Sequence, residues 1–133
     1  AVLQREAEVE ALVNNHRVSL GLNALEGLAS VREVSRGHSE HMIAHGFFGH
    51  TNPEADGPAV RAALAGLGHA KYGENIAAGY AGPLSVFNAW LASDGHRANI
   101  EDPEWTHHGV GYAFTPADPS QYLDYWTHNF LRR

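Results

Sequence analysis

The chain has 133 residues, of which 44% are hydrophobic and 18% charged, and its formal net charge is −6. These values fit one globular domain with a core of its own, so we treat residues 1–133 as a single domain. Basic residues are few and do not cluster apart from Arg132 and Arg133, which argues against nucleic acid as a partner, and no apolar run is long enough to cross a membrane.

Ten histidines and no cysteine set the other limits on this chain. Without cysteine there is no disulfide framework, and the redox compartment cannot be inferred directly. The histidines are numerous enough to reverse the sign of the net charge when the pH falls through the imidazole range near 6.5. The first residue is Ala1 rather than a methionine, which is what a processed or trimmed N-terminus would leave.

Hydrophobic periodicity predicts two long helices in the first part of the chain. Residues 3–20 carry apolar side chains at helical spacing, and residues 26–45 form a second such segment. The second stripe includes His41 and His45, which is unusual for a face that packs on a core. We expect these two histidines to lie at the edge of the core and to hydrogen-bond to backbone or water.

The remaining elements are shorter. The pattern predicts helices at 58–67 and from Pro83 onward, a short turn at 95–100, and strands at 74–80, 109–115 and 122–130. The last two strands should pair as an antiparallel hairpin. Because helices and strands do not alternate regularly, the order argues against a parallel doubly wound sheet.

Three separate segments each place a side chain that can bind metal or carry a proton next to a glycine. They are FFGH at 47–50, GENI at 73–76 and GHRANI at 95–100, and they contribute His50, Glu74 and His96. If the fold brings these together, two imidazoles and one carboxylate could bind a divalent metal or move protons. No local metal template such as H-E-x-x-H is present, so the alternative is three unrelated polar residues at turns.

Ser93 lies three residues before His96 and invites a second interpretation. A serine nucleophile with His96 as its base would need an orienting acid, for which Glu74 is available. No G-x-S-x-G nucleophile elbow is present. The alternative is a serine that caps the following helical turn.

Four segments in order, HSEHMIAHGFFGHTNP, YGENIAAGY, AWLASDGHRANIEDPEWTHHGVGYAF and YLDYWTHNF, resemble the CAP superfamily. This superfamily, also called the SCP-like extracellular proteins, includes cysteine-rich secretory proteins, insect venom antigens and plant pathogenesis-related proteins of group one. The resemblance covers about residues 8–130, and the missing cysteines are typical of the bacterial branch. It implies an α+β fold, an α-β-α sandwich with a small, mainly antiparallel central sheet between helical layers. It also implies a secreted or cell-envelope location, extracellular or periplasmic.

The resemblance extends to the site residues. The family's cavity carries two histidines and two acidic residues, and His50, Glu74 and His96 match three of these positions, whereas Ser93 stands where the animal pattern has its second glutamate. Three protein ligands and a water still form an acceptable zinc site, so the resemblance implies a metal site for Zn²⁺ or another divalent transition metal. The alternative role for Glu74 is that of a structural acid.

Three residues are candidates to line the cleft. The family often has a polar residue at the position of His38, Ser93 takes the place of the missing acid, and His128 replaces the glutamine of the Y-W-x-Q-x-F pattern.

The family's properties imply three functions. The first is a secreted module that binds a small amphiphile or a partner protein surface. The second is a metal-dependent or Ser/His hydrolase of a peptidase-like kind, with His50, Glu74, His96 and Ser93 as catalytic candidates. The third is an envelope protein without chemistry at the cleft. We favour the binding module.

Overall fold

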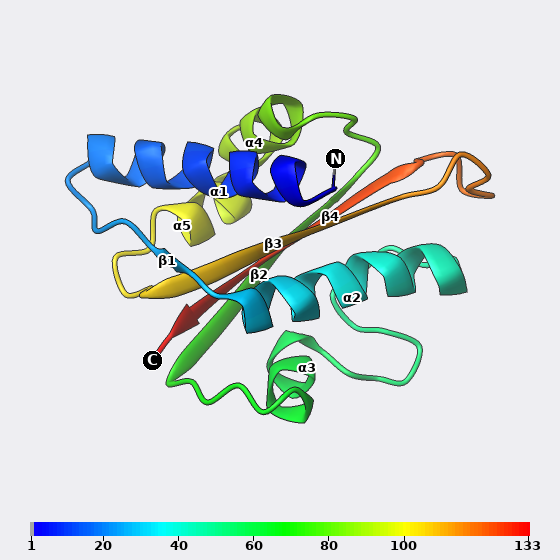
Figure 1. Ribbon diagram of the computed structural model, residues 1–133, viewed down its shortest axis with the longest axis horizontal. Coiled ribbons are helices and arrows are strands. Elements are labelled where there is room, and N and C mark those ends of the chain that lie inside the picture. The colour runs from blue at the N-terminus through cyan, green and yellow to red at the C-terminus, as the bar shows by residue number, and fades with distance from the viewer. Residues whose placement is uncertain (1) are drawn as a thin grey trace.

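Figure 1 shows a computed structural model, which describes residues 2–133. Within that range the chain forms five helices, namely α1 (Val2–Ser19), α2 (Ala29–His45), α3 (Pro58–Leu64), α4 (Pro83–Leu91) and α5 (Asp94–Ile100). Its four strands are β1 (Glu26–Gly27), β2 (Lys71–Ala78), β3 (His107–Phe114) and β4 (Asp124–Arg132). They lie in the order β1-β3-β4-β2, so β2 is an edge strand. Among the strands of residues 2–133, β1 and β3 pair in parallel, and the other two pairs are antiparallel.

The helices form a layer on each face of the sheet. Figure 1 shows α1, α4 and α5 on one face and α2 with α3 on the other. This arrangement confirms the predicted α-β-α sandwich with a mainly antiparallel sheet. None of the helices in residues 2–133 combines the length and the hydropathy needed to cross a membrane.

The larger core lies between the sheet and the α1/α4/α5 layer. Trp90, Trp105 and Trp126 are each at most 2% exposed there. Burial of such large aromatic side chains is the main source of stabilisation in a domain of this size.

Helix α2 packs on strand β3 with almost no space between the two backbones. A Cβ atom added at Gly109 would lie 2.5 Å from the backbone nitrogen of Arg32, and one added at Gly111 would lie 1.9 Å from that of Arg36. The hydroxyls of Ser35 and Ser39, on the same helix, donate to the carbonyls of these glycines. The glycines of the G-V-G segment are therefore required by close approach rather than by backbone conformation.

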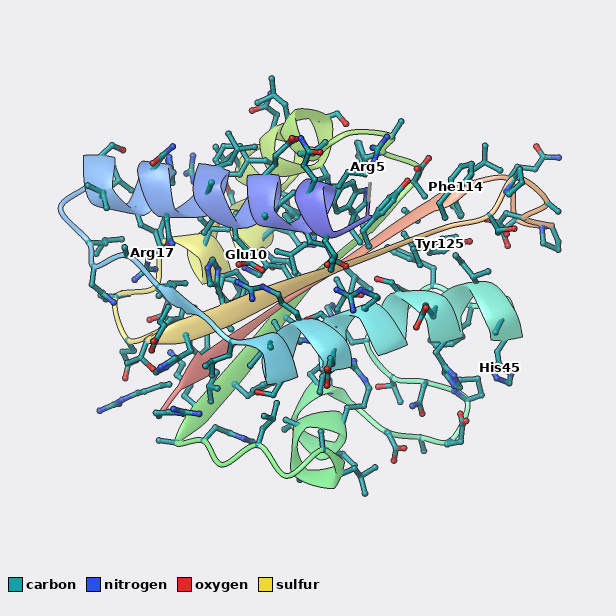
Figure 2. The ribbon with its side chains drawn as sticks, viewed as in Figure 1. Arg5, Glu10, Arg17, His45, Phe114 and Tyr125 are labelled. Carbon is teal, nitrogen blue, oxygen red and sulfur yellow. The ribbon has the colours of Figure 1, made fainter. Side chains whose placement is uncertain are left out.

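Two glutamates of α1 accept hydrogen bonds from backbone N–H groups of β3 that lie beyond the end of the short strand β1. Glu10 accepts a hydrogen bond from the backbone N–H of Val110, and Glu6 accepts one from the N–H of Tyr112. Both carboxylates also pair with arginines of α2, Arg32 for Glu10 and Arg36 for Glu6. Figure 2 shows Glu10 on the side of α1 that faces the sheet. These buried acids replace the missing strand partner and join the two helical layers around the sheet edge.

Several helix and strand boundaries differ from those predicted from the sequence, because strand pairing sets where these elements begin and end. Residues 26–27 form β1 instead of starting the second helix, because their backbone pairs with the start of β3. The predicted strands at 74–80 and 122–130 shift to 71–78 and 124–132, where β2 and β4 pair residue for residue. The predicted turn at 95–100 is the helix α5. Strand register and pairing depend on contacts with residues distant in sequence, and local periodicity carries no information about those contacts.

The α2–β3 contact generates a prediction. Gly111→Ala should destabilise the fold by about 3 kcal/mol or more, since its methyl group overlaps the α2 backbone, which cannot yield by a rotamer change. Gly37→Ala is the matched control, because it lies within α2 itself and its Cβ would meet nothing within 4 Å. It should stabilise the helix by about 0.5–1 kcal/mol. Urea denaturation followed by circular dichroism measures both, and equal stability of the two variants would contradict the assigned contact.

Candidate functional site

Glu74 lies at the centre of a cluster of charged side chains beside strand β2. His50 Nδ1 donates to Glu74 Oε1 at 2.8 Å. Arg61 of α3 donates to both carboxylate oxygens, at 2.7 and 2.9 Å, and also to the backbone carbonyl of His50. We call this group the His50–Glu74–Arg61 cluster. It joins the loop after α2, helix α3 and strand β2.

Burial and hydrogen bonding act in opposite directions on the carboxyl group of Glu74. Its side chain is 1% exposed, and this burial by itself raises its pKa. The hydrogen bonds from His50 and Arg61 outweigh burial, so the pKa of Glu74 lies below its ordinary value and the group is ionised at neutral pH. The side chain of His50 is half-exposed.

His96 forms a separate pair with Ser93. Its Nδ1 lies 2.8 Å from the Ser93 hydroxyl. Ser93 occupies the N-cap position of α5, as the capping interpretation expects, but its side chain makes no capping hydrogen bond. His96, three residues further on, places an imidazole nitrogen within reach of the hydroxyl instead. Burial lowers the pKa of His96 and the charge of the nearby His50 lowers it further, so its imidazole is neutral at pH 7.

A groove of about 290 Å³ runs over the outer edge of β2, and His96 and Ser93 form its polar part. We call it the aromatic groove. It is lined by residues of β2, α4, α5 and the loops that connect the elements: Phe48, Ile76, Ala77, Ala78, Tyr80, Ala89, Trp90, Ser93, His96 and Tyr122.

Asparagines hold α5 against strand β2. Asn75 donates to the backbone carbonyl of His96, and Asn99 donates to Asn75 Oδ1. Trp105 Nε1 in turn donates to the carbonyl of Asn99. These contacts give the two asparagines a structural role.

Two arginines that the sequence did not single out complete the framework. Arg61 neutralises Glu74, and the fully buried Arg17 of α1 donates to the carbonyls of Ile100 and Asp102 at the end of α5. Figure 2 labels Arg17 on the side of α1 that faces α5 and the sheet. No sequence signal would have found Arg61, because an arginine in a short helix is usually exposed to solvent. Its partner Glu74 is 13 residues away.

The three predicted ligands are brought together only in part. Glu74 and Asn75 are consecutive in β2, so their side chains project to opposite faces of the sheet. Glu74 accordingly meets α3 on one face, whereas His96 belongs to α5 on the other. His50 and Glu74 bond directly, and His96 lies close enough for His50 to affect its pKa but bonds to Ser93 instead.

A zinc ion does not fit this arrangement. Both oxygens of Glu74 already accept hydrogen bonds from Arg61, whose guanidinium supplies the positive charge that an ion would bring. Across residues 2–133, no group of three or more His, Asp or Glu side chains is arranged so that it could hold a metal ion. Metal binding at His50, Glu74 and His96 stays a prediction, and an ion there would first have to displace Arg61.

The other two cleft candidates do not line the aromatic groove. His38 is 2% exposed and donates from Nε2 to the carbonyl of Gly49, so it supports the loop that carries His50. Burial lowers its pKa. His128 is fully buried in the core beside Trp90, because every second residue of β4 faces the α1/α4/α5 layer. The expectation that His128 lines the cleft is wrong for that reason.

The chain matches known proteins over nearly its whole length. The model of the family described as "CAP: Cysteine-rich secretory protein family" matches residues 10–130. Two Bacillus subtilis proteins, the uncharacterized protein YkwD and the uncharacterized membrane protein YlbC, are 33% and 32% identical over 95% and 96% of this chain. The chain spans 46% and 34% of their respective lengths.

A solved structure shares the fold. An extracellular protein from Bacillus anthracis that contains an SCP domain superposes with a TM-score of 0.88 at 28% identity. The alignment covers 99% of this chain and 41% of that protein.

The buried histidines make stability depend on pH. His108 Nδ1 lies 2.9 Å from His128 Nε2. Burial lowers the pKa of His108 to about 4 and lowers that of His128 well below its ordinary value. In the unfolded chain both titrate near 6.5, so the unfolded state binds more protons below that pH. Their contribution to stability is therefore complete above about pH 6.5 and is lost as the pH falls toward 4.

We expect His128→Gln to weaken this pH dependence, because glutamine keeps a hydrogen-bonding amide but does not titrate. For one such histidine the loss of stability between pH 7.5 and 5 is about 2 kcal/mol. Urea denaturation at the two pH values measures it, and the exposed His45→Gln should behave like the wild type. An unchanged pH dependence in His128→Gln would show that other groups cause the acid sensitivity.

Proposed function

Since this chain belongs to the cysteine-rich secretory protein (CAP) family, we propose that it is an exported binding module whose aromatic groove takes a small amphiphilic ligand. The observation that carries this proposal is the lining of the groove, which is mostly apolar and aromatic and includes the hydrogen-bonded pair of Ser93 and His96 as its polar part.

The apolar part suits a hydrophobic ligand body. The aromatic rings of Phe48 and Tyr122 lie 6.3 Å apart, and the two residues are 49% and 47% exposed. When a ligand covers such apolar surface and removes it from water, the binding free energy becomes more favourable by roughly 25 cal/mol per Å². A volume of about 290 Å³ is near the lower limit for small-molecule sites, which favours a short chain or a single ring.

The polar part suits an uncharged or weakly polar head group. His96 is neutral at pH 7, because burial lowers its pKa, and Ser93 offers a hydroxyl beside it. The cation of Arg61 is paired with Glu74 and is only 9% exposed, so it is a poor partner for an anionic head. A hydroxyl, amide or ester group matches these donors and acceptors better than a carboxylate.

Export is supported by the relatives. The Bacillus anthracis protein that shares the fold is described as extracellular, and the family takes its name from secreted proteins. The chain spans less than half the length of these relatives, so the location and the partners of the whole protein belong to the proposal.

A hydrolase is the second candidate, and the 2.8 Å contact between Ser93 and His96 favours it. A serine triad also needs a carboxylate on the second imidazole nitrogen to orient the base. Glu74, the acid expected for that role, is held by His50 and Arg61 instead. The Ser93–His96 pair therefore lacks the group that would activate it.

Filling the apolar part of the groove should weaken ligand binding. We expect Ala89→Phe to reduce the affinity for a fluorescent medium-chain fatty amide by about tenfold or more, or about 1.4 kcal/mol, because the added ring occupies the space that the chain would take. Ala7→Phe, the same exchange at an exposed position of α1, should bind like the wild type. Fluorescence titration measures both, and equal affinities in the two variants would show that the amphiphile binds elsewhere.

The hydrolase alternative predicts covalent labelling of Ser93 by a fluorophosphonate. We expect no adduct, since the serine hydroxyl has no activated base. Intact-protein mass spectrometry of the wild type and of Ser93→Ala makes the comparison. If the wild type alone forms an adduct and the adduct maps to Ser93, the binding-module proposal is wrong and the protein is a serine hydrolase.

A further inference from the structure

Tyr122 reaches the aromatic groove from the loop that joins β3 to β4, residues 115–123. Figure 1 shows this loop at one end of the sheet, where the β3–β4 hairpin turns. The Tyr122 ring lies 6.3 Å from that of Phe48 and rests on the backbone of Gly79, where an added Cβ atom would lie 3.2 Å from the ring. This wall of the groove therefore depends on the conformation of the loop.

The backbone on both sides of Tyr122 has a left-handed conformation that residues with a side chain rarely adopt. The φ angle is 63° at Gln121 and 68° at Leu123. This conformation is unfavourable because it brings the Cβ atom too close to the following carbonyl oxygen. It persists only where the surrounding contacts hold it. Because these two residues flank Tyr122, the contacts that hold their backbone also set where the tyrosine ring lies.

The carboxylate of Asp118, which is 7% exposed, supplies these contacts. Its Oδ1 accepts a hydrogen bond from the backbone N–H of Ser120 at 3.0 Å. Its Oδ2 accepts hydrogen bonds from the backbone N–H groups of Tyr122 and Leu123, at 3.2 and 3.0 Å. Oδ2 also accepts a hydrogen bond from the hydroxyl of Tyr125 at 2.7 Å, and that side chain is buried in the core between the sheet and α2. A single carboxylate therefore holds the loop around Tyr122 and connects it to the core.

We propose that Asp118 is a positioning residue of the aromatic groove, and that it acts by holding Tyr122 in place as one wall. This inference rests on the proposed function. Asp118 does not line the groove itself, so its effect on a ligand passes through the tyrosine. Without the carboxylate, the left-handed backbone at Gln121 and Leu123 loses the contacts that hold it and relaxes. The Tyr122 ring then turns away from Phe48, and a ligand loses aromatic surface on that side of the groove.

The first test measures binding of the fluorescent medium-chain fatty amide by Tyr122→Ala, Asp118→Ala and the double variant. Each single exchange should lower the affinity by about tenfold, because an aromatic side chain no longer covers the ligand. The double variant should bind like Tyr122→Ala, since a residue that acts through the tyrosine has no effect once the ring is absent. Asp118→Asn, which keeps one acceptor oxygen, should bind with an affinity between those of Asp118→Ala and the wild type. Thr115→Ala, a change elsewhere in the same loop, should bind like the wild type.

A second measurement needs no ligand and separates this inference from the proposed function. In NMR spectra of the free wild type, we expect nuclear Overhauser contacts between the Tyr122 ring and the α-protons of Gly79. Asp118→Ala should lose these contacts, and Thr115→Ala should keep them. If the contacts depend on Asp118 but the wild type does not bind the amide, Asp118 still positions Tyr122 and only the binding proposal is wrong.

Two results would overturn the inference. One is that the contacts between Tyr122 and Gly79 persist in Asp118→Ala. The other is that the losses of affinity add up in the double variant, which would show that Asp118 acts through general stability rather than through the tyrosine. Thermal denaturation checks that each variant is folded at the temperature of the titration. If Asp118→Ala does not fold, Tyr125→Phe removes only the hydrogen bond from the core and should lower the affinity in the same direction by a smaller factor.

Discussion

The direct contact of helix α2 with the backbone of strand β3 is the constraint on which the other features depend. Gly109 and Gly111 allow the helix to approach until Ser35 and Ser39 hydrogen-bond to the strand carbonyls. Any side chain at these positions would push α2 outward. Helix α2 ends at Gly46, which adopts a left-handed conformation. The position of α2 on the sheet therefore sets the point from which the loop carrying His50 starts.

Buried polar contacts, rather than apolar packing alone, join the two helical layers. Glu6 and Glu10 reach around the edge of the sheet from α1 to the arginines of α2, and each also satisfies a strand N–H. Removing one partner of such a network leaves an uncompensated buried charge, which costs more than the intact pair contributes. The arrangement therefore specifies how the layers assemble more strongly than it stabilises them.

Charge pairing also limits the chemistry of the cleft. Arg61 gives Glu74 a fixed cation, so the carboxylate is neither a free metal ligand nor an orienting acid for His96. His50 and His96 then belong to two separate pairs beside strand β2. What remains open to a ligand is a mostly apolar groove with the Ser93–His96 pair as its polar part, and the proposed binding function rests on this combination.

Local patterns in the sequence predicted the long helices and identified the three segments around His50, Glu74 and His96, whereas the fold class was implied by the resemblance to the CAP superfamily. The pairing of Arg61 with Glu74, the pairing of His96 with Ser93 and the burial of His128 in the core became known from the folded chain alone. Each of these outcomes depends on which face of β2 or β4 a side chain occupies and on which helix covers that face. Strand register and layer packing arise from contacts between residues distant in sequence, so spacing along the chain carries no information about them.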